Sequence, residues 1–331
     1  MMRQVPDQTR WGILGTARIV RRAFLPAVAE AGGVAAVVAS RDGDRAVRWA
    51  HDNGVGRVAV GYQRLIEDPD VDALYIPLPN ALHAEWTIKA LQAGKPVLCE
   101  KPLTGSLAGT ERVLAVARQT GTLLWEAFVF PFHDQMRRVR DLLAAGTIGE
   151  LREIQSNYHF PLSSPGSNIR MSAELAGGAL NDIGSYPVWL ARHLFGAEHH
   201  TASASAIWDP GGVDVATWGY LGFPGGRKLL LSCGFRRAED TFSRLLGTEG
   251  QIHLSNGFHP GATDRFEVWL PGRAPVTHPA AGPNQHSFTP AIQHIQAAIQ
   301  GREAPRELAV DISLGSARAL ADLAASAHER S

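Results

Sequence analysis

Short apolar runs alternate with helix-like stretches through roughly the first 130 residues. The runs are apolar throughout, which is typical of strands that are buried on both faces of a parallel sheet. The predicted strands are Trp11–Leu14, Val34–Ala39, Ala73–Ile76, Val97–Cys99 and Leu123–Phe128, and the predicted helices are Ala17–Ala31, Asp42–Asn53, Ala81–Ala93 and Leu107–Thr120. This alternation predicts a doubly wound α/β domain with helices on both faces of its sheet.

The pattern changes after Phe130. Longer strand-like runs follow one another, joined by turns such as 210–212 (Pro-Gly-Gly), which is typical of an antiparallel sheet. The predicted strands are Leu151–Phe160, Thr201–Trp208, Val213–Phe223, Arg227–Phe235, Phe242–Leu246 and Gln251–Leu254, and the predicted helices are Arg137–Ala145, the end of Gly177–Phe195, Gln285–Gln300 and Ile312–Ala327. We therefore expect domains at 1–130 and 131–331, with a C-terminal helix that can pack back on the first.

Composition narrows the class of protein. A chain of 331 residues, 45% of them hydrophobic, can fill two cores. The 32 basic residues balance the 32 acidic ones, so nothing predicts a nucleic-acid or membrane partner. The two cysteines, Cys99 and Cys233, lack metal-type spacing, the pair His199-His200 has no obvious carboxylate partner, and we expect no metal site. With no apolar signal region or spanning run, we expect a cytoplasmic protein.

The first predicted strand runs into a turn that can hold a phosphate. The turn is Gly15-Thr16-Ala17-Arg18-Ile19, and a helix follows it. Gly15 suits a tight turn, and Ala17 still lets the backbone approach a pyrophosphate at the helix N-terminus. The alternative is an ordinary strand-turn-helix; the surrounding α/β alternation favours the cofactor interpretation.

The end of the second strand bears on the choice of cofactor. An acidic residue there would bind the ribose 2′-hydroxyl of NAD, but this chain has Ser40-Arg41, with Arg45 about one helical turn on. A hydroxyl and two guanidinium groups suit the 2′-phosphate of NADP. The alternatives are that the two arginines are solvated surface charges and that Asp42 reaches the ribose of NAD. The sequence therefore predicts NADP, with NAD as the alternative.

A lysine follows the strand Val97–Cys99 within the tripeptide Glu100-Lys101-Pro102. Ligands of open α/β sheets bind outside the carboxyl ends of the strands, so Lys101 is expected to point toward the nicotinamide region. Taken alone, such a tripeptide is usually a surface turn.

These features together resemble the Gfo/Idh/MocA oxidoreductases over nearly the whole length. The residues that carry the resemblance are 11–19 (WGILGTARI), 76–83 (IPLPNALH), 98–103 (LCEKPL), 126–128 (EAF), 177–187 (GGALNDIGSYP) and 247–250 (GTEG). The blocks 177–187 and 247–250 look most like the branch of NADP-dependent D-xylose dehydrogenases, dimeric dihydrodiol dehydrogenases and glucose-fructose oxidoreductases. The resemblance implies a Rossmann α/β domain followed by an α+β domain with a large, mainly antiparallel sheet.

The resemblance also implies catalytic roles. Lys101 matches the family lysine that contacts the substrate and the nicotinamide ribose, Asp182 the aspartate that orients the reacting hydroxyl, and Tyr186 the acid or base. Spacing of i, i+4 would put Asp182 and Tyr186 on one helix face. A nearby lysine ammonium would lower the pKa of the tyrosine and make it a usable base. The alternative is that Tyr186 is a packed helix residue and Asp182 a helix cap; His83 or Lys101 would then carry the proton.

The remaining expected contacts follow the same comparison. On the cofactor side they are Pro77, Leu78, Asn80, His83 and Glu100. On the substrate side they are Trp125, Phe128, Asn157, Phe160 and Arg170, beside the three catalytic residues. For each aromatic residue the alternative is core packing, and for Arg170 it is a surface position. The run Phe130-Pro131-Phe132-His133 departs from this branch and alters the edge of the pocket or the hinge.

Three functions remain open from the sequence. The first is an NADP-dependent aldose 1-dehydrogenase, with D-xylose as the type substrate. The second is a trans-dihydrodiol dehydrogenase, and the third a nucleotide-binding sensor without catalysis, against which the presence of Lys101, Asp182 and Tyr186 argues. A cofactor that copurifies with the protein would indicate sugar–sugar dismutation. We also expect a homodimer or homotetramer, formed through an apolar open face of the antiparallel sheet.

Overall fold

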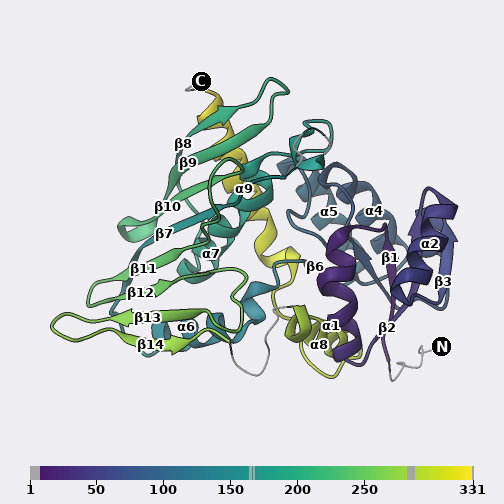
Figure 1. The fold of residues 1–331 in the computed structure, drawn as a ribbon, viewed down its shortest axis with the longest axis horizontal. Coiled ribbons are helices and arrows are strands. Elements are labelled where there is room, and N and C mark those ends of the chain that lie inside the picture. The colour runs from purple at the N-terminus through teal and green to yellow at the C-terminus, as the bar shows by residue number, and fades with distance from the viewer. Residues whose placement is uncertain (1–7, 164–165, 167, 282–287, 330–331) are drawn as a thin grey trace. The chain divides into compact units, whose positions relative to one another are not determined.

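The computed structural model describes residues 8–163, 166, 168–281 and 288–329. They form two compact units (Figure 1). The first unit takes its described residues from Met1–Thr104, Ala108–Val129 and Phe288–Leu314, and the second from Gly105–Leu107, Phe130–Ser287 and Gly315–Ser331. Each unit is built around its own sheet.

The first unit contains a parallel sheet with the strand order β3–β2–β1–β4–β5–β6. The strands are β1 (Arg10–Leu14), β2 (Val34–Ser40), β3 (Arg57–Val60), β4 (Ala73–Ile76), β5 (Val97–Cys99) and β6 (Leu124–Glu126). The neighbours β1 and β4 lie at the point where the strand order reverses, and ligands of such sheets bind at the carboxyl ends of the strands there. The predicted parallel α/β domain is confirmed.

Helices connect these strands. They are the π-helical turn η1 (Val20–Phe24), α1 (Leu25–Glu30), α2 (Gly43–Asn53), α3 (Tyr62–Ile66), α4 (Asn80–Gln92) and α5 (Leu107–Thr120). A further helix of this unit is α8 (Phe288–Ile299). Helix α8 comes from late in the chain but packs on α1, where the Thr289 hydroxyl donates to Glu30. The sequence missed β3 and α3, because both are short and β3 is a half-exposed edge strand.

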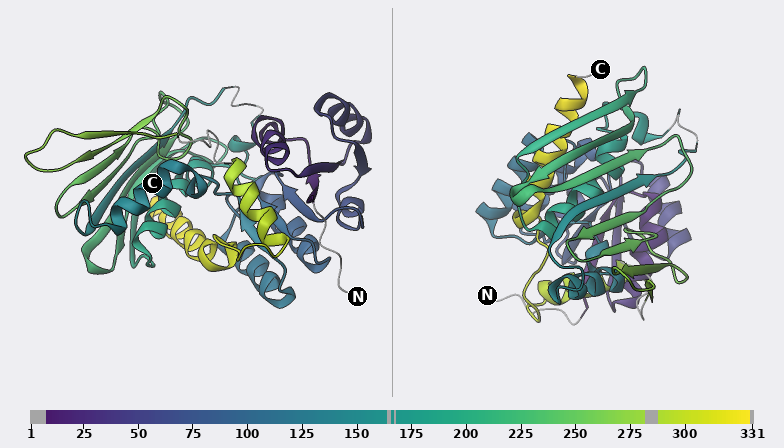
Figure 2. Two further views of the ribbon diagram at one scale, coloured as in Figure 1. Left: turned by 90° about the horizontal axis from the view of Figure 1, so that it is seen from below. Right: turned by 90° about the vertical axis from the view of Figure 1, so that its left-hand side faces the viewer.

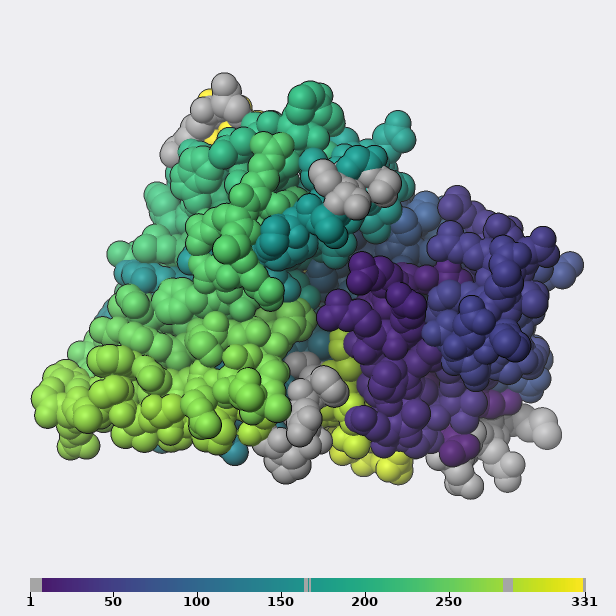
Figure 3. Space-filling view, viewed as in Figure 1, coloured from purple at the N-terminus to yellow at the C-terminus, as the bar shows by residue number. Residues whose placement is uncertain are grey.

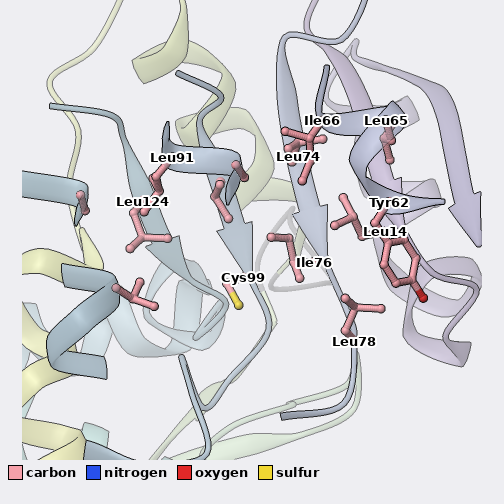
Figure 4. Close-up of a cluster of buried hydrophobic side chains, with 14 of the residues drawn as sticks. Leu14, Tyr62, Leu65, Ile66, Leu74, Ile76, Leu78, Leu91, Cys99 and Leu124 are labelled. Carbon is pink, nitrogen blue, oxygen red and sulfur yellow. The ribbon is translucent and has the colours of Figure 1, made fainter. Parts of the chain in front are cut away.

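A buried apolar cluster fills the space between this sheet and its helices (Figure 4). Leu14, Ile76 and Cys99, each at the carboxyl end of a strand, are fully buried members of it. All four residues of β4 are buried, which explains why the run reads as apolar without alternation. The core therefore holds the carboxyl ends of the central strands in place.

The second unit contains a larger sheet with the strand order β14–β13–β12–β11–β7–β10–β9–β8. Neighbouring strands are antiparallel except β7 and β10, which are parallel. The strands are β7 (Leu151–His159), β8 (Thr201–Trp208), β9 (Asp214–Phe223), β10 (Arg227–Gly234), β11 (Ser243–Gly247), β12 (Gln251–Leu254), β13 (Arg265–Trp269) and β14 (Val276–Pro279). The mainly antiparallel sheet is confirmed, while β13 and β14 were not predicted.

Helices cover one face of this sheet. The helical segments of this unit are η2 (Phe130–Phe132), α6 (Asp134–Ala144), η4 (Ile169–Met171), the π-helical turn η5 (Leu180–Gly184), α7 (Ser185–Phe195), η6 (Pro224–Gly226) and, from Gly315 on, α9 (Ala309–His328). Of these, η6 is the turn between β9 and β10. Helix α7 packs on β7 and β10, and the C-terminal part of α9 lies behind the sheet in the right-hand view of Figure 2. Ile154, Leu229, Leu245 and Ile252 are paired across the strands and fully buried on the covered face.

The opposite face of the second sheet carries apolar side chains that are exposed to solvent. Trp218 and Tyr220 alternate along β9, and Leu230 lies opposite Tyr220 on β10. In the part of the chain that the structure describes, no helix is long and apolar enough to cross a membrane.

Candidate active site

The turn after β1 has the geometry of a phosphate loop. Gly15 adopts a φ of 103°, and its amide donates to the Ala39 carbonyl on β2 at 2.8 Å. A Cβ at Gly15 would lie 3.1 Å from the Leu78 side chain, so glycine here avoids both a strained backbone conformation and a close contact. The chain then enters a helix at its buried residue Val20, and the first amides of a helix lack intrahelical partners. Thr16, Ala17, Arg18 and Ile19 therefore lie where a diphosphate would fit.

Arg41 directly follows β2, and Arg45 lies in the first turn of α2. The dark blue and purple atoms of this part of the chain lie at the surface in Figure 3. Arg41 and Arg45 are exposed, whereas Ser40 is buried and its hydroxyl accepts from the Asp42 amide. The Asp42 carboxylate accepts from the Arg45 amide at 3.0 Å and caps α2. Capping gives Asp42 a structural role, and the exposed guanidinium groups fit a 2′-phosphate.

Two anchors hold the loop that contains Lys101. On one side the Tyr75 hydroxyl donates to Glu100 at 2.7 Å. On the other side the Leu103 amide donates to the buried Glu126 carboxylate at 2.7 Å, and the Ser313 hydroxyl donates to the same carboxylate. The Lys101–Pro102 peptide bond between them is cis. Sequence reasoning did not assign a role to Glu126, although its place at the end of a buried strand, like that of Glu100, was a usable signal.

His83 ties this loop to the one before it. Its side chain is fully buried on α4, with Nδ1 2.9 Å from the Pro102 carbonyl and Nε2 2.7 Å from the Leu78 carbonyl. Burial lowers the pKa of His83, and the two carbonyl contacts oppose that shift. Pro77 is buried beside Leu78, and Asn80 is half-buried at the start of α4. A histidine enclosed by two carbonyls is suited to holding backbone, and this disfavours its role as the proton carrier.

Asp182 and Tyr186 lie on the helical segment that packs against the second sheet. Asp182 is in η5 and Tyr186 in the first turn of α7, and both side chains are buried. The predicted i, i+4 pair therefore crosses from a π-helical turn into an α-helix. Arg170 of η4 donates from Nε to an Asp182 carboxylate oxygen at 2.5 Å.

Arg170 links the charged and aromatic parts of this group. Asp182 raises the pKa of Arg170, and the phenols of Tyr186 and Tyr158 act in the same direction. The guanidinium also lies 5.8 Å from the centre of the Phe160 ring. The structure thus brings together four of the predicted residues, Phe160, Arg170, Asp182 and Tyr186.

An aromatic cluster surrounds the Tyr186 ring. The ring centres of Phe258, Tyr158 and His259 lie 5.1, 5.2 and 5.4 Å from that of Tyr186. Tyr158 stacks on Phe258 at 5.7 Å, and His259 is exposed. Sequence reasoning missed Phe258 and His259, because they lie in a loop without periodicity about 70 residues after Tyr186.

The other predicted substrate residues lie in the first unit or on the other face of the second sheet. Trp125 is buried in the first unit, where its indole donates to the Arg306 carbonyl at 3.0 Å, and Phe128 is buried in the same unit. Asn157 lies on the opposite face of the second sheet from Tyr158 and donates to Asp240 at 3.2 Å. Core packing and strand alternation account for these three positions.

The cysteines and histidines outside this group do not add a reactive site. Burial raises the pKa of the Cys99 and Cys233 thiols well above their ordinary range. His199 has a carboxylate partner that the sequence did not reveal, since its Nε2 lies 2.8 Å from Asp322. Among the described residues, no group of three or more His, Cys, Asp or Glu side chains could hold a metal ion.

Comparisons with known proteins cover both units. The family model described as "Oxidoreductase family, NAD-binding Rossmann fold" (GFO/IDH/MocA) matches residues 9–128. The model of the GFO/IDH/MocA C-terminal domain matches residues 136–253. The two matches together take in the phosphate loop, Lys101, Asp182 and Tyr186.

Several characterised relatives act on sugars. The chain is 43% identical over 259 residues to dTDP-3,4-didehydro-2,6-dideoxy-alpha-D-glucose 3-reductase of Streptomyces violaceoruber, covering 77% of this chain and 75% of the relative. It is 33% identical over 296 residues to D-xylose 1-dehydrogenase (NADP(+)) 2 of Haloferax volcanii, covering 89% of this chain and 90% of the relative.

A solved structure shares the whole fold. It is a 3-ketoreductase from Actinomadura kijaniata in complex with NADP and TDP-benzene, with a TM-score of 0.87 and 35% identity over 97% of this chain and 98% of that chain. Further structures of that enzyme contain a lysine-to-alanine, a lysine-to-glutamate or a tyrosine-to-phenylalanine substitution.

Proposed function

The chain belongs to the Gfo/Idh/MocA oxidoreductase family, and we propose that it transfers a hydride between NADP and a sugar carbon that carries a hydroxyl or keto group. The observation that carries this proposal is the Arg170–Asp182 ion pair beside the buried Tyr186 phenol. A carboxylate, a guanidinium and a phenol in one place can orient a hydroxyl and exchange its proton.

The first unit supplies the cofactor contacts in this proposal. The turn from Gly15 to Ile19 holds the diphosphate, and Ser40, Arg41 and Arg45 hold the 2′-phosphate. NADP bound there supplies the hydride acceptor for alcohol oxidation, or the donor in its reduced form. The relatives that were solved with NADP or named for NADP support this choice over NAD.

The second unit supplies the proton chemistry. In the reductive direction Tyr186 gives its proton to the carbonyl oxygen while the carbonyl carbon gains a hydride, and in the oxidative direction both transfers reverse. Asp182, fixed by Arg170, accepts a hydrogen bond from a substrate hydroxyl and orients it. We assign Lys101 to contact with the reacting hydroxyl and the nicotinamide ribose, and to stabilisation of the tyrosine phenolate.

Two sugar substrates have specific support. A free aldose, oxidised at C1, agrees with the D-xylose dehydrogenase relative. A dTDP-linked 3-keto sugar agrees with the higher identity to the 3-reductases. The aromatic cluster around Tyr186 suits the apolar C–H face of either sugar, and it also suits a trans-dihydrodiol.

The experiment is a substrate panel read by NADPH absorbance. NADP or NAD is offered with aldoses, inositols and a trans-dihydrodiol, and NADPH with a dTDP-linked 3-keto sugar, with Lys101→Ala as the background control. We expect one sugar class to turn over with NADP and the variant to be nearly inactive. Clear NADP binding without turnover of any compound would favour the sensor interpretation.

A further inference from the structure

Asp214 is a buried carboxylate directly beside the segment that carries Asp182 and Tyr186. It is the first residue of β9 and only 8% exposed. One of its oxygens, Oδ2, accepts from the Leu180 amide at 2.7 Å and from the Thr217 hydroxyl at 2.8 Å. Leu180 is the first residue of η5, so a side chain from the sheet binds the start of the helical segment.

The backbone before η5 is shaped to admit this carboxylate. Gly178 has a φ of 109°, and a Cβ there would lie 2.2 Å from Asp214 Oδ1. The Gly178 amide donates to the Arg170 carbonyl at 2.9 Å, and a Cβ at Gly177 would lie 2.3 Å from that same carbonyl oxygen. The two glycines therefore let the segment fit between Asp214 and the loop of Arg170.

We propose that Asp214 is a positioning residue, which fixes the start of η5 and thereby sets Asp182 and Tyr186 against Arg170 for proton transfer. The proposal rests on the function proposed above for these three residues. Asp214 itself touches neither substrate nor cofactor in this account. A shift of about 1 Å at the reacting groups can lower turnover by about a hundredfold, so a small movement of the segment is enough.

The energetics favour a role in catalysis over one in stability. A negative charge near the first amides of a helix is favourable, but burial opposes it and raises the pKa of Asp214 to about 6. An asparagine could accept the same amide hydrogen bond without the cost of burying a charge. The ionised carboxylate therefore suits a strong, charge-assisted hydrogen bond that fixes the segment in place.

The titratable groups near Asp214 determine which of them could cause a pH effect on turnover. Cys233 faces it from β10, and Asp182 of η5 acts on Cys233 in turn. Burial keeps the Cys233 thiol neutral through a raised pKa, and Asp182 is paired with Arg170. A loss of turnover on acidification through about pH 6 is therefore expected from protonation of Asp214, which weakens its hold on the Leu180 amide.

The test compares Asp214→Asn with Asp209→Asn in the full-length enzyme. Asp209 likewise accepts from a backbone amide, that of Val213 at 2.9 Å in the turn before β9, so it is a matched control. For Asp214→Asn we expect kcat to fall about tenfold to a hundredfold, while KM for NADP stays unchanged. The pH profile of the variant is expected to lack the acid limb, which is the loss of turnover below about pH 6. The control is expected to keep kcat and the acid limb of the wild type.

A second readout does not depend on activity. Hydrogen exchange of the peptide around Leu180 is expected to be faster in Asp214→Asn than in the wild type and Asp209→Asn. The milder variant Thr217→Val removes one donor to the carboxylate and should move the acid limb to higher pH.

Each result decides a separate question. Unchanged kcat and pH profile in Asp214→Asn would overturn the positioning role, whatever the exchange rates. If the peptide around Leu180 exchanges faster in Asp214→Asn but the wild type turns over no sugar, the contact of Asp214 with η5 is supported and the proposed function is refuted.

Discussion

The Tyr186 phenol, to which we assign the proton transfer, lies beside several polar groups. The Arg170 guanidinium, which interacts with the phenol, has a raised pKa and stays charged at working pH, and the rings of Tyr158 and His259 lie 5.2 and 5.4 Å from the Tyr186 ring. Such a setting favours a tyrosine that exchanges its proton with a bound hydroxyl. The packing of the ring against Phe258 and Tyr158 fixes the direction of the ring.

Tyr186→Phe tests that role. The ring and its packing are retained, and only the group that exchanges the proton is lost. We expect kcat to fall by about 10²- to 10⁴-fold, while the dissociation constant for NADP stays the same. Steady-state kinetics and cofactor fluorescence titration measure both. Tyr220→Phe, on the exposed face of β9, is the control, and turnover within a few fold of the wild type in Tyr186→Phe would move the proton role to Lys101.

The arginines after β2 determine cofactor preference in this account. Arg41→Ala with Arg45→Ala removes two guanidinium groups that fit the 2′-phosphate, so we expect KM for NADP to rise about tenfold or more and KM for NAD to change little. Arg48→Ala, an exposed position further along α2, is the matched control. An unchanged ratio of the two KM values would refute the assignment.

Single residues also show what the sequence could predict about the site. Lys101 and Gly15 follow buried strands, so their place at the carboxyl ends was predictable from pattern alone. Asp182 and Tyr186 came from the family resemblance, and the structure adds the Arg170 ion pair, which joins positions 12 residues apart. Phe258 and Asp214 reach the same group from distant elements, and no local spacing reveals such contacts.

At the level of elements, the segment from η5 to α7 differs most from the prediction. The sequence predicted a helix only at the end of Gly177–Phe195, and the structure begins it at Leu180 with a π-helical turn. The Asp214 carboxylate accepts from the first residue of this turn and two glycines precede it, and π-bulges often occur at functional sites. Strand alternation placed Tyr158 and Phe160 on one face, but it also separates Asn157 from them.

The buried Asp214 carboxylate makes the stability of the second unit depend on pH. Its pKa is raised from 3.8 to about 6 on folding, so the folded state binds the proton more tightly than the unfolded state. The stability present below pH 3.8 is therefore lost as pH rises from 3.8 to about 6, by about 3 kcal/mol in total.

Urea unfolding at a series of pH values checks this prediction. The free energy of unfolding of the wild type should fall relative to that of Asp214→Asn between pH 4 and pH 7, and the difference should be constant above pH 7. Parallel curves for the two proteins over the whole range would show that the carboxylate titrates normally.

At the level of the whole molecule, the face of the second sheet opposite its helices exposes apolar side chains to solvent. Trp218 is 47% exposed and Tyr220 43%, and Ile207 and Leu230 lie on the same face. Large apolar side chains exposed together on one sheet face are typical of an interface, and we propose that a second copy of the chain covers this face.

Trp218→Glu tests this association. A charge in the middle of the face should shift the protein from dimer or tetramer to monomer, as measured by sedimentation velocity. Val47→Glu, at an exposed apolar position on α2, is the control and should keep the assembly of the wild type. A monomeric wild type at working concentration would contradict the proposal.

The central claim is hydride transfer between NADP and a sugar, and isotope transfer measures it directly. The protein is incubated with NADP and aldoses that carry deuterium at C1, or with C4-deuterated NADPH and a dTDP-linked 3-keto sugar, and mass spectrometry follows the label. We predict that one deuterium moves between the sugar carbon and the nicotinamide. Binding of NADP with no transfer of label to or from any sugar would contradict the account.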